Sequence, residues 1–139
     1  MSSKISLRAA EALHSGAIRV LRLVRAEDAQ AGIGPAQLSA LSVLVFAGEK
    51  TVGELAALEQ VQPPTMSRIV DGLAQKKLVE RVSSANDRRT VQITATPAGR
   101  KLLLAGRDRR VRALAKRFDG LSKKEVETLL AAAEIMKRI

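Results

Sequence analysis

One short segment carries several side chains that can hydrogen-bond base edges or phosphates of a nucleic-acid duplex: Thr65, Ser67, Arg68 and Gln75. Hydroxyl, guanidinium and amide groups are the donors and acceptors that proteins use for such contacts. Gln62 lies just before this segment, and Pro63 and Pro64 open it with residues that have no backbone N–H. We take Gln62 and Pro64 as candidate DNA contacts together with the four polar residues. A solvated helix face has a similar composition, so this pattern alone leaves both interpretations open.

A second basic cluster lies in the polar stretch that contains Asn86, Asp87, Arg88 and Arg89. β-rich runs at 79–82 and 91–94 flank this stretch, which predicts a hairpin with a protruding basic tip. An arginine at such a tip can enter a narrow minor groove, where the negative potential is enhanced. Asp87 is suited to orienting an arginine through a charge-assisted hydrogen bond rather than to contacting DNA. Asp87, Arg88 and Arg89 are therefore candidate site residues.

Two predicted helices would position the first cluster. Thr51 and Glu54 have the spacing of a capping box, which predicts a short helix through residue 59 with three apolar residues facing the core: Leu55, Ala56 and Leu58. The proline pair then opens another helix with apolar residues at i, i+3, i+4 and i+7, which predicts a buried stripe: Met66, Ile69, Val70 and Leu73. Two short helices joined by a brief turn are the sequence form of a helix-turn-helix.

Longer helices are predicted on both sides of this motif. An amphipathic pattern covers residues 4–26, and a helix opened by Pro35 runs to about residue 47. Thr96 and Pro97 predict the start of a helix that extends to residue 118, and Ser122 begins a final capping box. The predicted fold class is mainly α with a small β-hairpin, within a single domain.

The chain is strongly basic, with 24 Lys and Arg residues against 14 Asp and Glu and a net charge of +10. The charge is uneven, because residues 96–118 hold eight bases and one acid. Such a balance favours a polyanionic partner. The two aromatic residues, Phe46 and Phe118, are too few for base stacking on single strands, which favours duplex DNA. A membrane surface is the weaker alternative, since residues 100–117 are charged on several sides.

Several other classes of function are disfavoured. The chain has no cysteine and a single histidine, His14, so we expect no metal site and no cofactor. It has none of the phosphate-loop, zinc-protease or nucleophile-elbow motifs, and we expect it not to be an enzyme. The first sixteen residues have no uninterrupted apolar block, which predicts a cytoplasmic protein without a signal peptide.

The segment from Val52 to Leu103 resembles the DNA-binding core of the MarR (multiple antibiotic resistance regulator) family. The most specific pieces are Leu78–Arg81, Asp87–Arg89 and Ile93–Arg100. The resemblance extends over residues 1–139 and implies one MarR-type domain, with a winged helix-turn-helix core at about 35–95. Dimerisation helices at about 4–30 and 96–139 would flank it. The resemblance further implies a homodimer on pseudo-palindromic promoter DNA, in a family with many repressors released by phenolic or carboxylate ligands.

The chain departs from the family pattern at two positions. Lys77 occupies the place of a usual glycine, and lysine adopts a left-handed backbone only at a cost, so we expect a local difference in that turn. Ala95 and Thr96 replace the usual leucine and threonine, which keeps the helix cap but shrinks its apolar neighbour. The absence of cysteine also excludes the thiol chemistry of the peroxide-sensing members.

The function predicted from these features is sequence-specific transcriptional regulation, as a repressor released by a small aromatic or carboxylate ligand. The resemblance implies an effector site between the dimerisation helices and the winged core, so the candidate site pairs Arg8 and His14 of the first helix with Leu41 and Leu44 of the second. Three alternatives stay open. The chain could be an architectural DNA-binding protein without ligand control, its terminal helices could pack within a monomer, and the effector site could be a filled core.

Overall fold

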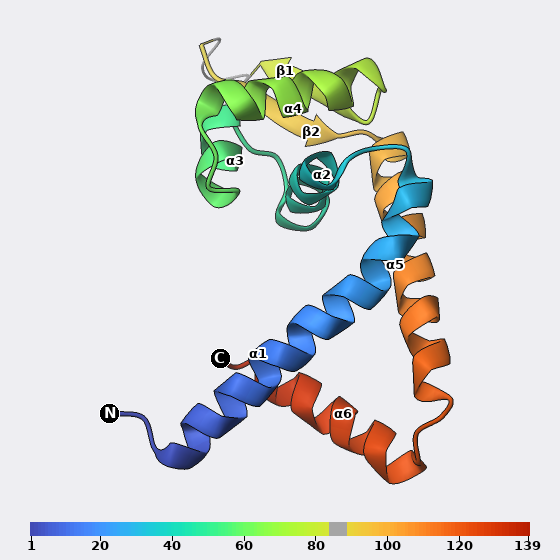
Figure 1. Cartoon of the computed structure of the whole chain (residues 1–139). Coiled ribbons are helices and arrows are strands. Elements are labelled where there is room, and N and C mark those ends of the chain that lie inside the picture. The colour runs from blue at the N-terminus through green and yellow to red at the C-terminus, as the bar shows by residue number, and fades with distance from the viewer. Residues whose placement is uncertain (84–88) are drawn as a thin grey trace. The chain divides into compact units, whose positions relative to one another are not determined.

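The computed structural model describes residues 1–83 and 89–139 (Figure 1). It divides the chain into two compact units, Glu27–Arg109 and Met1–Ala26 with Arg110–Ile139. Helices and a two-stranded hairpin build it, in this order: α1 (Lys4–Arg25), the 3-10 helix η1 (Ala26–Ala31), α2 (Pro35–Ala47), α3 (Val52–Leu58), α4 (Pro63–Gln75), β1 (Val79–Ser83), β2 (Val91–Ala95), α5 (Pro97–Phe118) and α6 (Lys123–Met136). The predicted fold class, mainly α with a small hairpin, is confirmed.

The unit Glu27–Arg109 contains the hydrophobic core, to which α2 contributes four buried residues: Leu38, Ala40, Leu41 and Leu44. Pro35 occupies the first position of α2, where its missing N–H costs no helical hydrogen bond. The helix ends at Gly48, whose φ of 83° and ψ of −174° lie in a region that is accessible to glycine almost alone. The predicted bounds of this helix are therefore confirmed.

Helix α3 begins with the predicted capping box. The Glu54 N–H donates to the Thr51 hydroxyl at 3.1 Å, and the Thr51 N–H donates to the Glu54 carboxylate at 3.3 Å. Leu55 and Ala56 are buried in the core as predicted, whereas Leu58 is 57% exposed. The prediction was wrong for Leu58 because α3 is short and ends at this residue, so the side chain lies beyond the packed part of the helix.

The apolar stripe of α4 packs into the same core. Met66, Val70 and Leu73 are buried, and Ile69 is half-buried at the edge of the stripe. The residues at i, i+3, i+4 and i+7 thus lie on one apolar face of a helix, as predicted. Burying this face leaves the opposite side of α4 exposed to solvent.

The strands β1 and β2 form an antiparallel hairpin in which Val79 pairs with Ala95 and Arg81 pairs with Ile93. Lys50, in the loop before α3, adds an isolated bridge to the other edge of β2. Its N–H donates to the Ile93 carbonyl at 3.2 Å, and the Ile93 N–H donates back at 2.7 Å. Ile93 is fully buried, so the base of the hairpin is held by both backbone bonds and core packing.

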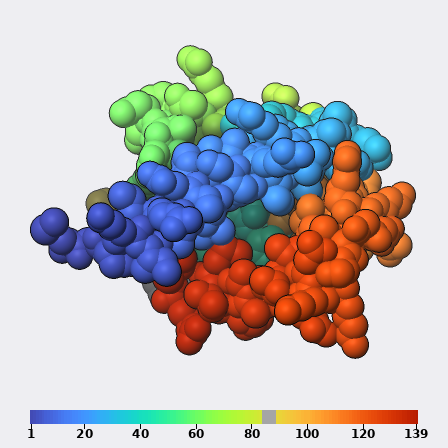
Figure 2. Space-filling model, turned by 60° about the horizontal axis from the view of Figure 1, so that its bottom comes forward, coloured from blue at the N-terminus to red at the C-terminus, as the bar shows by residue number. Residues whose placement is uncertain are grey.

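The unit Met1–Ala26 with Arg110–Ile139 has the opposite character, because no residue of α1 or α6 is buried. Apolar side chains are instead exposed along both helices, among them Ile5, Leu21, Leu130 and Ile135. The space-filling view shows the side chains of α1, in blue, lying at the surface along the helix (Figure 2). The Ser122 and Glu125 capping box predicted for α6 is confirmed, and its hydrogen bonds lower the pKa of the Glu125 carboxyl.

Candidate nucleic-acid interface

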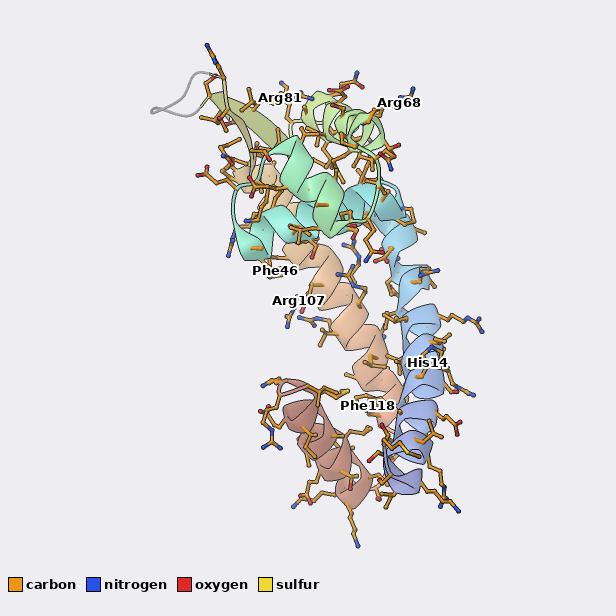
Figure 3. The ribbon with its side chains drawn as sticks, turned by 90° about the vertical axis from the view of Figure 1, so that its left-hand side faces the viewer. His14, Phe46, Arg68, Arg81, Arg107 and Phe118 are labelled. Atoms are coloured by element: carbon orange, nitrogen blue, oxygen red, sulfur yellow. The ribbon has the colours of Figure 1, made fainter. Side chains whose placement is uncertain are left out.

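The exposed face of α4 carries the polar residues that the sequence singled out. Thr65, Arg68 and Gln75 are exposed, and Ser67 is half-buried. Arg68 projects from α4 at the end of the unit where Arg81 also projects from the hairpin (Figure 3). Since α4 is the second helix of the helix-turn-helix, it has the place of a recognition helix, which lies in the major groove in this class of motif.

The two other predicted residues lie at the start of α4. Gln62 is the N-cap residue, and its side chain makes no hydrogen bond to the helix. Pro64 follows in the first turn and is exposed. The positive end of the helix dipole at this point favours a nearby anion such as a phosphate, but Pro63 and Pro64 offer no backbone N–H to bind it.

The turn that leads into α4 contains Gln60 with a φ of 56°. The Gln60 N–H donates to Ala57 at 3.3 Å, and the Val61 N–H donates to Ala56 at 3.0 Å. This pair of hydrogen bonds is the Schellman pattern, which ends a helix with one residue in the left-handed conformation. The turn of the helix-turn-helix is therefore set by backbone bonds rather than by side chains.

The turn that follows α4 repeats this pattern. Lys77 has a φ of 59°. Its N–H donates to Ala74 at 2.9 Å, and the Leu78 N–H donates to Leu73 at 3.0 Å. The expected local difference is absent, because Lys77 adopts the left-handed conformation that a glycine would favour. Lysine takes this conformation at a cost of about 1 kcal/mol or more, since Cβ approaches the following carbonyl oxygen.

Thr96 connects this second turn to the start of α5. Its hydroxyl donates to the Lys77 carbonyl at 2.7 Å and accepts from the Gly99 N–H at 3.0 Å. The Thr96 N–H also donates to the Leu78 carbonyl at 3.0 Å. The predicted cap on α5 is confirmed, and it joins the end of the recognition helix to α5. Ala95, the smaller neighbour, packs against the edge of the core.

The hairpin is placed as a wing beside α4, although its tip falls outside the described residues. Asp87 and Arg88 belong to that undescribed segment, as does Asn86. Arg89 is described, exposed, and lies two residues before β2. Of the three predicted wing residues, Arg89 alone is therefore located by the structure.

An ion pair joins α4 to the wing, and sequence reasoning missed it. The Arg81 guanidinium of β1 donates to the Asp71 carboxylate of α4. A signal for this contact was present, because Arg81 lies two residues after the buried Val79 and so projects to the same face of the strand. Asp71 was not among the candidate site residues, although it lies on the same exposed face of α4 as Arg68.

The four predicted effector-binding residues come from different units. Arg8 and His14 are exposed on α1, whereas Leu41 is completely buried and Leu44 is 4% exposed in the core of the other unit. Leu44 also borders an open hollow of about 490 Å³ within that unit. The end of α2, the end of β2 and the start of α5 line the hollow, which has one carboxylate, Glu49, and one guanidinium, Arg100.

Together, a helix-turn-helix, a two-stranded wing and a net charge of +10 define a winged helix-turn-helix DNA-binding protein. Comparison with known proteins agrees with this class. The model of the MarR family matches residues 31–90. A helix-turn-helix-type transcriptional regulator of Mycobacterium bovis is 34% identical over 129 residues, which span 93% of this chain and 90% of that protein. The helix-turn-helix-type transcriptional repressor MdtR of Bacillus subtilis is 33% identical over 111 residues, or 78% of this chain and 68% of its own length.

Solved structures share the fold. A MarR family protein from Bacillus stearothermophilus has a TM-score of 0.82 at 23% identity, covering 99% of this chain and 96% of its own. A transcriptional regulator from Thermotoga maritima has a TM-score of 0.82 at 25% identity, covering 94% of this chain and 92% of its own. The chain therefore belongs to the MarR family of transcriptional regulators, whose members bind DNA and act as dimers.

The relatives are regulators of transcription rather than enzymes. Across residues 1–83 and 89–139, no three His, Asp or Glu side chains gather into a metal-binding group. No single helix in this part of the chain is long and apolar enough to cross a bilayer.

Proposed function

We propose that this protein is a homodimeric, sequence-specific repressor that places α4 in the major groove and the hairpin beside it. The observation that carries the proposal is the face of α4: Thr65, Arg68 and Gln75 are exposed on a helix whose other face is buried in the core. Backbone turns hold both ends of this helix, so its polar side chains are presented from a rigid element. Rigid presentation favours selective contacts with base edges.

The two compact units support one MarR-type domain with a DNA-binding part and a proposed dimerisation part. The compact unit Glu27–Arg109 includes the winged core proposed at about 35–95 and extends into α5. The other unit holds α1, the end of α5 and α6, which form part of the proposed dimerisation helices at about 4–30 and 96–139, whereas residues 27–30 and 96–109 lie in the first unit. In this arrangement α5 connects DNA binding to dimerisation.

A second copy of the chain is the proposed partner of α1 and α6. Their exposed apolar side chains favour burial, and members of this family act as dimers. Leu130 is 65% exposed, so Leu130→Glu is harmless in a monomer but places a charge in a dimer interface. We expect sedimentation to show a dimer for the wild type and dissociation for Leu130→Glu. Lys124→Glu on the polar side of α6 is the control, and a monomeric wild type would contradict the proposal.

Sequence specificity separates this function from an architectural DNA-binding role. A regulator binds its operator about 10³-fold or more tightly than unrelated DNA at the same salt concentration, whereas an architectural protein binds both with similar affinity. The test is selection from a randomised duplex pool, followed by competition between the selected and a scrambled duplex. We expect an inverted repeat whose half-sites lie one helical turn apart, as a two-fold dimer requires. Equal competition by scrambled DNA would support the architectural alternative.

Release by a small aromatic acid is the proposed control of repression. The Bacillus subtilis relative MdtR is named a repressor, and this chain has an open hollow with apolar walls and one cation, Arg100. A guanidinium binds a carboxylate through paired hydrogen bonds, and the apolar walls would accept an aromatic ring. Such a ligand releases DNA only if it binds the DNA-free geometry more tightly.

Salicylate at constant ionic strength is a suitable probe for this control. We expect millimolar salicylate to weaken operator binding. A variant without the cation that binds the salicylate carboxylate is expected to keep its operator affinity when salicylate is added. Arg100→Ala tests the hollow, while Arg8→Ala and His14→Ala test the site predicted from the sequence. Unchanged operator affinity and no saturable heat of binding would contradict control by aromatic acids.

A further inference from the structure

The ion pair between Asp71 and Arg81 joins two elements that the proposed function brings to DNA. Its donor is the Nη2 atom of Arg81, on the first strand of the wing, and its acceptor is the Oδ1 atom of Asp71, on the recognition helix. The pairs Lys123–Glu127 and Lys137–Glu134 differ, because each joins residues about one helical turn apart at one end of the chain. The Asp71–Arg81 pair instead constrains the wing relative to α4.

The strand pairing explains why Arg81 reaches α4. Arg81 lies directly opposite Ile93 in the ladder, and directly opposed residues project to the same face of a sheet. Val79, two residues earlier on β1, shares that face. Both Val79 and Ile93 are buried against the core. Arg81 therefore leaves its strand on the face that packs against α4, and its side chain remains 40% exposed.

Asp71 is an unusual residue for the place it occupies. It lies one turn after Arg68 and one turn before Gln75 on α4, and its side chain is 58% exposed. A bare carboxylate at this position would repel the phosphates of an approaching duplex. The ion pair offsets this charge. A guanidinium has five N–H donors in a planar fork, so it can bond a carboxylate and a phosphate at the same time.

We infer that Asp71 is a positioning residue for DNA binding and that Arg81 is a phosphate contact. In this arrangement Asp71 does not touch DNA. It holds the Arg81 guanidinium beside α4, where the guanidinium binds a backbone phosphate at the edge of the major groove. The inference rests on the proposed placement of α4 in that groove, and it adds Arg81 to the predicted contacts of α4 and Arg89.

The sign of one mutational effect separates positioning from simple electrostatics. Removing the Asp71 carboxylate makes the protein more positive by one charge near the DNA, which by Coulomb attraction alone strengthens binding. Removing a positioning residue releases Arg81 and weakens binding. The two mechanisms therefore predict opposite changes in affinity for the same variant.

The experiment measures binding of a duplex selected by the wild-type protein from a randomised pool, over a series of salt concentrations. Asp71→Ala and Arg81→Ala are each expected to weaken binding about tenfold. Each is also expected to flatten the plot of log affinity against log salt by about 0.9, the share of one phosphate. The double variant is expected to bind no more weakly than Arg81→Ala, because both changes remove the same contact.

Glu80→Ala is the matched control. Glu80 is the neighbour of Arg81 on β1, is exposed, and projects to the opposite face of the hairpin. This variant loses one carboxylate as Asp71→Ala does, and it is expected to bind DNA at least as tightly as the wild type. Thermal unfolding checks that each variant is folded. If Asp71→Ala is unstable, Asp71→Asn keeps the side-chain shape and is expected to show a smaller loss of affinity.

Three results would overturn the inference. They are binding by Asp71→Ala or Asp71→Asn that equals or exceeds the wild type, full additivity in the double variant, and an unchanged salt slope in Arg81→Ala. A wild-type protein that selects no sequence from the pool would instead count against the proposed function, so the two failures are distinguishable.

Discussion

The hydroxyl of Thr96 donates to the backbone carbonyl of Lys77 at 2.7 Å and links the start of α5 to the end of the recognition helix. The same oxygen accepts the Gly99 N–H at 3.0 Å, so one buried side chain satisfies two backbone groups. Lys77, Thr96 and Gly99 all lie in the unit Glu27–Arg109, so this contact joins the recognition helix to the helix that continues along the chain into the other unit.

Replacing this hydroxyl is expected to be costly. Thr96→Val keeps the shape of the side chain but leaves the Lys77 carbonyl and the Gly99 N–H without their partner. The expected loss is about 1–3 kcal/mol in the free energy of unfolding, measured by urea denaturation. Thr128→Val is the control, because the Thr128 hydroxyl bonds only its own exposed helix, at Lys124. Equal losses in the two variants would contradict the proposed importance of the junction.

Replacing the left-handed residues on either side of α4 with glycine is expected to make the protein more stable. Lys77→Gly and Gln60→Gly remove a Cβ from a strained backbone, and each is expected to raise the free energy of unfolding by about 0.5 kcal/mol after the entropic cost of glycine. Lys76→Gly is the control, since Lys76 has a φ of −86° and gains nothing from glycine. It also loses a 2.6 Å hydrogen bond to the Gly32 carbonyl. Destabilisation of all three variants would contradict the account of these turns.

Gly99 is expected to tolerate no side chain. A Cβ at this position would lie 2.1 Å from the Leu78 carbonyl oxygen, a backbone atom that cannot move away alone. Gly99→Ala is therefore expected to lower the free energy of unfolding by about 1–3 kcal/mol. Gly120→Ala, where nothing lies within 4 Å, serves as the control. A fully stable Gly99→Ala would show that α5 does not pack closely against this turn.

Local sequence signals predicted most of the fold. Pro35, the Thr51–Glu54 box and the Ser122–Glu125 box mark helix starts through interactions within one turn, which a single sequence contains in full. The stripe of α4 was equally clear, because its period belongs to one helix. The prediction that Leu58 is buried failed because helix periodicity does not show where the core ends.

The site and the backbone around it were only partly predictable, because several contacts join residues distant in sequence. Lys76 bonds Gly32 across 44 positions, and Lys50 bridges to Ile93 outside the two predicted strands. The Asp71–Arg81 pair required both the helix and the strand to be placed first. The expected local difference at Lys77 was wrong because it was based on residue type alone. Tertiary packing and backbone hydrogen bonds impose the left-handed conformation that lysine by itself disfavours.

The wing is expected to contribute electrostatically to DNA binding. Arg89→Ala should weaken binding and flatten its salt dependence by about the share of one phosphate, while the variant stays folded. Arg138→Ala, which removes an exposed arginine near the C-terminus, controls for the loss of net charge. Unchanged affinity of Arg89→Ala at physiological salt would remove this residue from the interface.

Base reading by α4 is the central claim, and Arg68 tests it most directly. The measurement compares the wild type, Arg68→Ala and Arg68→Lys on every single-base variant of the selected operator at one salt concentration. The account predicts that Arg68→Ala loses about 1–3 kcal/mol of binding free energy and loses its preference at one position in each half-site. Arg68→Lys should retain part of both, since lysine keeps the charge without the planar fork. An equal loss on every duplex, with the base preference intact, would assign Arg68 to a phosphate and contradict base reading by this residue.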